Sequence, residues 1–62
     1  MDMYGKDPAI YEVYVYSEGD NAMFERKAFT GQEAIEIVRA ELFLADDPRA
    51  TCSMGARVKR EG

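Results

Sequence analysis

The stretch "AIYEVYVYSEG", residues 9–19, alternates between two sets of side chains. One set consists of Tyr11, Val13 and Val15. The positions between them hold Glu12, Tyr14 and Tyr16. A period of two predicts a β-strand, which presents one set on each of its faces. The second set contains two tyrosines, so the pattern raises the question of what that face contacts.

Turn-forming residues, SEGDN, follow this strand, and a second strand over residues 22–29 then completes a hairpin. A four-residue loop predicts Tyr16 opposite Met23. It also places Glu12 opposite Lys27, which is a favourable charge pair. A loop one residue longer or shorter would exchange the two faces of the second strand.

The period of the apolar residues changes after the second strand, in the sequence FTGQEAIEIVRAELFLADDP. Thr30 is the expected N-cap of a helix, and Glu33 is its partner in a capping box. We predict a helix over residues 31–45. It ends before Pro48, because the residue that precedes a proline avoids the helical conformation.

Alternation returns in "ATCSMGARVK", residues 50–59, which predicts a third strand. The second strand, the helix and the third strand form a crossover unit, which is right-handed in almost all proteins. If the third strand lies beside the first, every neighbouring pair of strands is antiparallel. The predicted fold is therefore α+β, a ββαβ unit whose three-stranded sheet has the order 2-1-3 and whose helix covers one face. We expect a single domain over residues 1–62, with a loose leader at 1–8 and a frayed end at 60–62.

Apolar side chains remain after the helix has covered one face of the sheet. Ile37, Ala40 and Leu44 form a second stripe on the helix, and Tyr14 and Tyr16 lie on the open face of the sheet. Exposed apolar residues are common on ordinary protein surfaces, but two separate patches on so short a chain favour a contact surface. A chain of 62 residues also has a thin core, so we predict a homodimer.

The charge of −4 is unevenly distributed along the chain. Residues 1–48 contain eleven acids and four bases, a balance of −7, whereas residues 49–62 contain four bases and one acid, a balance of +3. The acidic part disfavours general binding to phosphate backbones. No apolar stretch is long enough to span a membrane, the start resembles no signal peptide, and the single Cys52 fits a reducing compartment. We expect a soluble cytoplasmic protein without a membrane partner.

The sequence lacks the residues that most catalytic mechanisms require. The chain contains no histidine, which excludes the Ser-His and Cys-His nucleophile pairs, and it has no glycine-rich phosphate loop. Asp46 and Asp47 are expected to be a solvated helix end rather than a metal site, and Cys52 a small core residue. We therefore expect no enzymatic activity, no cofactor and no bound metal.

Aromatic and basic residues share the predicted open face of the sheet, in the form of Tyr14, Tyr16, Arg57 and Lys59. Such a combination is typical of platforms that bind single-stranded nucleic acid. Glu12 on the same face and the negative net charge argue against that use. We expect instead that the tyrosines pack on the basic side chains, and that nucleic-acid binding is the weaker hypothesis.

In size and charge the chain is similar to small acidic proteins of phages and mobile elements, some of which, such as anti-CRISPR proteins, occupy a host protein's surface. The likeness involves no motif and transfers no residues. We expect a non-enzymatic protein-binding module, an inhibitor or regulator whose partner is basic or handles nucleic acid. The candidate partner-binding residues are Tyr14, Tyr16, Ile37, Leu44, Arg57 and Lys59. Two alternatives remain: binding of single-stranded nucleic acid on the open sheet face, and a small regulatory subunit of a larger complex.

Overall fold

The computed structural model describes residues 7–59. The first two strands, β1 (Ala9–Ser17) and β2 (Asp20–Ala28), form a hairpin. They are followed by α1 (Gly31–Leu44), the short 3-10 helix η2 (Pro48–Thr51) and β3 (Ser53–Val58).

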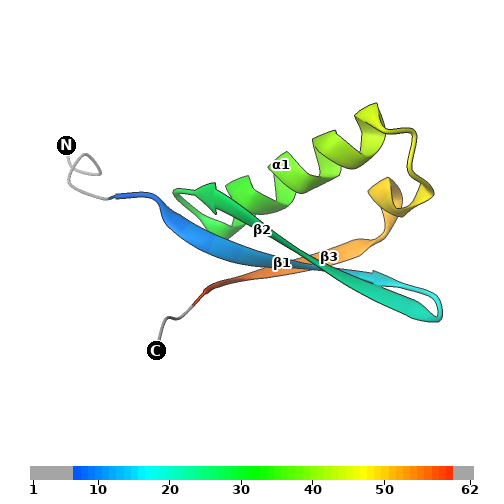
Figure 1. Ribbon diagram of the computed structural model, residues 1–62, viewed down its shortest axis with the longest axis horizontal. Helices are drawn as coiled ribbons and strands as arrows, with labels where there is room; N and C mark the ends of the chain where they lie inside the picture. Colours follow the sequence, from blue (N-terminus) through cyan, green and yellow to red (C-terminus); the bar gives the residue numbers. More distant parts are fainter. Residues whose placement is uncertain (1–6, 60–62) are drawn as a thin grey trace.

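The three strands form one antiparallel sheet in the order β2-β1-β3, and α1 lies to one side of it (Figure 1). The predicted α+β fold with strand order 2-1-3 is confirmed. Most of the predicted leader and all of the predicted frayed end lie outside the described residues. Within the described residues, no helix combines the length and the apolar character needed to cross a membrane.

The hairpin turn is shorter than the predicted four-residue loop. Ser17 pairs with Asp20, so that only Glu18 and Gly19 connect the two strands. Gly19 has a φ of +78°, a conformation that glycine adopts without the steric cost of a side chain. The turn therefore closes earlier, and β2 begins at Asp20 rather than at residue 22.

The shorter turn makes the predicted register wrong by two residues. Tyr16 lies opposite Asn21 instead of Met23, and Glu12 lies opposite Glu25 instead of Lys27. A shift of two residues keeps every side chain on its expected face, because side chains alternate with a period of two.

The N-terminus of α1 has the predicted cap. The hydroxyl oxygen of Thr30 accepts a hydrogen bond from the backbone amide of Glu33, at 3.0 Å. The carboxylate of Glu33 accepts one from the backbone amide of Phe29, at 2.7 Å, which is one residue before the expected position. The first contact satisfies an amide that the helix itself leaves unbonded, and the second satisfies the amide of the residue that precedes the cap.

The C-terminus of α1 is closed by a reversal of the backbone at Asp46. Asp46 has a φ of +59°, and its amide donates to the carbonyl oxygen of Phe43 at 3.0 Å. The amide of Asp47 donates to the carbonyl oxygen of Leu42 at 2.8 Å. These two bonds form a Schellman motif, with an aspartate at the position that usually holds glycine.

The third strand begins three residues later than predicted, because the first residues of the expected strand belong to η2. Pro48 occupies the start of this turn, where its fixed φ fits, and the carboxylate of Asp47 accepts the amide of Arg49 at 2.9 Å. Cys52 lies between η2 and β3 and is half-buried against the core. The prediction that it belongs to the third strand is wrong.

The core lies between α1 and the inner face of the sheet. Its buried residues are Val13, Val15, Ala28, Ala34, Val38, Leu42 and Ala50. Arg39 ties the helix to the segment before β3, because its Nη1 donates to the carbonyl oxygens of Ala50 at 2.6 Å and of Cys52 at 3.3 Å. Because Val13 and Val15 point into the core, the residues that alternate with them along β1 face the opposite side of the sheet.

Candidate functional site: the open face of the sheet

The open face of the sheet is the side away from α1, as the ribbon shows (Figure 1). Tyr14 and Tyr16 on β1 lie on this face, next to Met23 on β2 and to Gly55 and Arg57 on β3. Tyr16 and Met23 are 52% and 45% exposed. The sheet thus presents aromatic and apolar side chains on a face that no other described segment covers.

Glu12, Tyr14 and Arg57 form one hydrogen-bonded group on this face. The hydroxyl of Tyr14 donates to Oε1 of Glu12 at 2.8 Å, and Nε of Arg57 donates to the same oxygen at 2.9 Å. The Arg57 guanidinium also lies 5.7 Å from the centre of the Tyr14 ring, within the range of a cation–π contact. Tyrosine and arginine therefore pack on each other, and the glutamate compensates the arginine's charge.

The same contacts shift the protonation equilibria of the group. The hydrogen bond from Arg57, followed by the one from Tyr14, lowers the pKa of Glu12 below its ordinary value of 4.5. The hydrogen bond to Glu12 raises the pKa of Tyr14 above 10.0. At neutral pH the group consists of a carboxylate, a protonated phenol and a guanidinium.

Tyr16 lies over Gly55, and this contact shapes a hollow on the open face. A Cβ atom at Gly55 would lie 3.4 Å from the hydroxyl oxygen of Tyr16 and 3.6 Å from its ring. The Tyr16 ring therefore lies close above the backbone of β3 at Gly55. The hollow beside this contact has a volume of about 470 Å³ and is also lined by Tyr14 and Arg57.

The second basic residue predicted for this face is also compensated. Nζ of Lys59 lies 3.1 Å from Oε2 of Glu25 on β2. Arg57 and Lys59 thus each have a carboxylate partner on the same sheet face. Neither glutamate was among the predicted binding residues, although Glu12 and Glu25 occupy the same alternating positions as the tyrosines and Met23.

The second apolar stripe that is predicted on the helix is only partly exposed to solvent. Ile37 is half-buried and packs against the core. Ala40 and Leu44 are exposed, with 89% of Leu44 accessible to solvent. The predicted stripe is therefore divided between half-buried Ile37 and exposed Leu44. Leu44 lies on the helix side of the sheet, whereas Tyr14 and Tyr16 lie on the open face.

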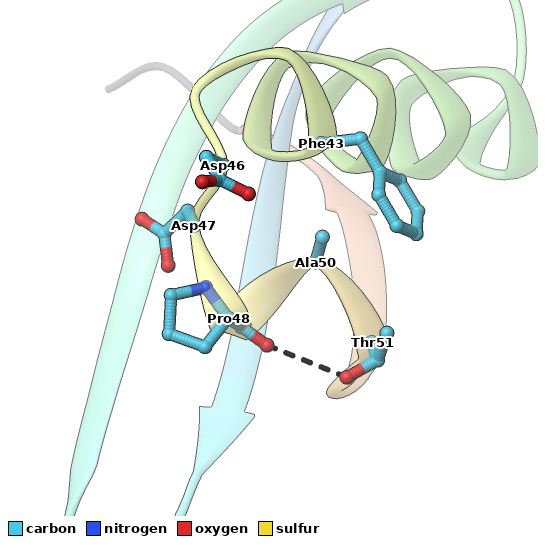
Figure 2. Close-up of a pocket in the computed structure, with 6 residues that line it drawn as sticks. All are labelled: Phe43, Asp46, Asp47, Pro48, Ala50 and Thr51. Atoms are coloured by element: carbon cyan, nitrogen blue, oxygen red, sulfur yellow. Dashed lines mark hydrogen bonds between the residues drawn. The ribbon is translucent and has the colours of Figure 1, made fainter.

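A second hollow lies at the end of α1, with a volume of about 370 Å³ (Figure 2). The side chain of Phe43 extends from the helix toward η2 and borders the hollow together with Ala50 and Thr51. Asp46 and Asp47 lie on its other side, and the carboxylate of Asp47 is paired with Arg49 at 2.7 Å. Within residues 7–59, no three metal-ligating side chains come together here or elsewhere.

Comparisons with known proteins add no assignment to this geometry. No protein-family model, no curated protein and no solved structure gives a significant match to the chain.

Proposed function

We propose that this chain is a non-enzymatic protein-binding module that covers part of a partner protein with the open face of its sheet. The observation that carries the proposal is the combination on this face of exposed Tyr16 and Met23, a hollow over Gly55, and ion-paired charges. Tyrosine, methionine and arginine are enriched in protein interfaces relative to the rest of the protein surface.

Binding of single-stranded nucleic acid is less well supported by the same face. Such platforms combine stacking rings with cations that contact phosphates. Here the two cations that accompany the tyrosines, Arg57 and Lys59, are both engaged by carboxylates. Phosphates would have to compete with Glu12 and Glu25, and the net charge of −4 opposes their approach.

The charge of the chain favours a basic partner. Exposed acids surround the hairpin turn at Glu18 and Asp20, and Glu36 lies exposed on the helix. Complementary charge around an interface accelerates association and disfavours partners of the same sign. A protein that handles nucleic acid has such a basic surface, and a module that occupies it acts as an inhibitor or regulator.

The proposal is tested by comparing two charge insertions in affinity capture from lysate of the native host. Met23→Glu places a carboxylate on the open face, and Leu44→Glu places one on the exposed end of the helix. Because both native side chains are exposed, neither change disturbs the core. We expect the captured protein to be lost with Met23→Glu and retained with Leu44→Glu, and then to show the same pattern in calorimetry with purified partner. Loss with Leu44→Glu alone would contradict the proposal.

The nucleic-acid alternative is tested by fluorescence anisotropy with labelled single-stranded DNA and RNA at physiological salt. We expect no binding in the micromolar range. Micromolar binding that disappears in both Tyr14→Ala and Arg57→Ala would replace the proposed function with the alternative.

A further inference from the structure

The outer edge of β3 presents backbone groups that β1 does not use. The amide of Lys59 donates to the carbonyl oxygen of Ile10 at 2.8 Å, which makes these two residues a hydrogen-bonded pair. Bonded and non-bonded pairs alternate in an antiparallel ladder, so Arg57, Gly55 and Ser53 also point their backbone groups toward β1. The residues between them point theirs outward, and these are Met54, Ala56 and Val58.

This outward row has a defined beginning. The amide of Cys52 donates to the carbonyl oxygen of Arg49 at 3.0 Å, and its carbonyl accepts from Arg39. The free row therefore starts at Met54. Figure 1 shows β3 at the border of the sheet, with β1 as its one neighbouring strand among the described residues.

The two edge strands, β2 and β3, differ in how strongly their side chains oppose pairing with another chain. By the same alternation the outward residues of β2 are Asn21, Met23, Glu25 and Lys27, two of which are charged. Charged side chains on an edge strand oppose pairing with another chain. The first four residues of β3, Ser53 to Ala56, carry no charge, and Val58 near its end is an apolar residue with 47% exposure.

We propose that a second copy of this chain pairs with β3 in antiparallel orientation, with the twofold axis passing beside Ala56. In this register Met54 lies opposite the second copy's Val58, so all three outward residues of each copy find backbone partners. The inner faces then bring Val58 and Met54 into cross-strand contact, and the small Ala56 lies at the axis. This pairing does not depend on the proposed function of the open face.

Charge and hydrogen bonding select this register over its neighbours. An axis beside Arg57 would place the two Arg57 side chains opposite each other, and like charges in that position destabilise a sheet. An axis beside Gly55 would place Val58 opposite Cys52, whose backbone groups already have partners. The Ala56 register places Arg57 opposite Gly55, which has no side chain, and each arginine keeps its Glu12 partner.

The test combines sedimentation equilibrium with edge-specific proline variants. Ala56→Pro removes an amide that points away from β1, so the ladder inside the monomer is retained and the second copy loses a donor. Asn21→Pro makes the same change on the outward row of β2 and is the matched control. We expect wild type and Asn21→Pro to dimerise, and Ala56→Pro to associate at least tenfold more weakly. Circular dichroism establishes that each variant is folded.

A second variant covers the case in which Ala56→Pro does not fold. Val58→Glu changes an exposed side chain, and we expect the same tenfold loss of association. In wild type, the amides of Met54, Ala56 and Val58 should exchange with solvent slowly at high protein concentration and quickly on dilution. A wild-type monomer at high micromolar concentration would overturn the proposal, as would a dimer that Asn21→Pro separates and Val58→Glu does not.

Discussion

Replacement of Asp46 by glycine is expected to stabilise the protein, because Asp46 closes α1 in a backbone conformation that suits glycine. Its φ is +59°, and its amide and the next one bond back to the last turn of the helix. The left-handed conformation costs a residue with a side chain about 1 kcal/mol. A carboxylate at the negative end of the helix dipole costs about 0.3–1 kcal/mol more. The greater freedom of glycine in the unfolded chain removes about 0.5–1 kcal/mol of this gain. The net expectation is a gain of about 0.3–1.5 kcal/mol.

Urea denaturation followed by circular dichroism measures this gain. For a domain of this size a denaturant slope of about 1 kcal/mol per molar converts it into an upward shift of about 0.3–1.5 M in the midpoint. Asp46→Asn separates the two contributions, because asparagine tolerates the same conformation and removes the charge. High salt should abolish the gain of the asparagine variant and leave the conformational part of the glycine gain. A glycine variant less stable than the asparagine variant would refute the conformational argument.

Three further changes test other parts of the structure. Thr30→Ala should lower the free energy of unfolding by about 1 kcal/mol through loss of the N-cap, whereas Thr30→Ser should retain most of it in the same urea assay. Arg39→Met leaves two main-chain carbonyls without their donor and should cost about 1–2 kcal/mol in thermal unfolding; an unchanged midpoint would mean that this tether contributes nothing. Glu12 has a pKa held below 4.5 by Arg57 and Tyr14, so its contribution to stability is present above that pH and is lost as the pH falls through the folded-state pKa. The urea midpoint of Glu12→Gln should therefore fall less than that of wild type as the pH is lowered. An equal fall would contradict the stabilising role of the Glu12 carboxylate.

The element order and the faces of the strands could be predicted from the sequence because both depend on local patterns. Alternation places Val13 in the core and Tyr14 on the open face, and the capping pair of Thr30 and Glu33 marks the helix start. The hairpin register could not be chosen in this way. A shift of two residues buries the same faces, so the pattern of apolar residues is the same in both registers, and the conformation of Gly19 decides between them.

The composition of the open face was predictable, but its charge pairing was not. Tyr14, Tyr16 and Arg57 share a face in any register that keeps the parity of the strands. The bond between Arg57 and Glu12 depends on which residues of β1 and β3 lie directly opposite each other. Similarly, the helical spacing of Ile37 and Leu44 shows that they are neighbours on the helix, whereas the position of the helix over the sheet determines that Ile37 is half-buried and Leu44 exposed.

The position of β1 in the centre of the sheet has a consequence for the order in which the molecule assembles. Its neighbour β2 follows after two residues, whereas 35 residues separate Ser17 at the end of β1 from Ser53 at the start of β3. A hairpin of this kind forms in about 1–10 μs, while closure of a longer loop has a higher entropic cost. We therefore expect the hairpin to form before β3 pairs with β1. In a chain that has formed the hairpin alone, the second edge of β1 is unpaired, and such an edge is open to mispairing with other strands.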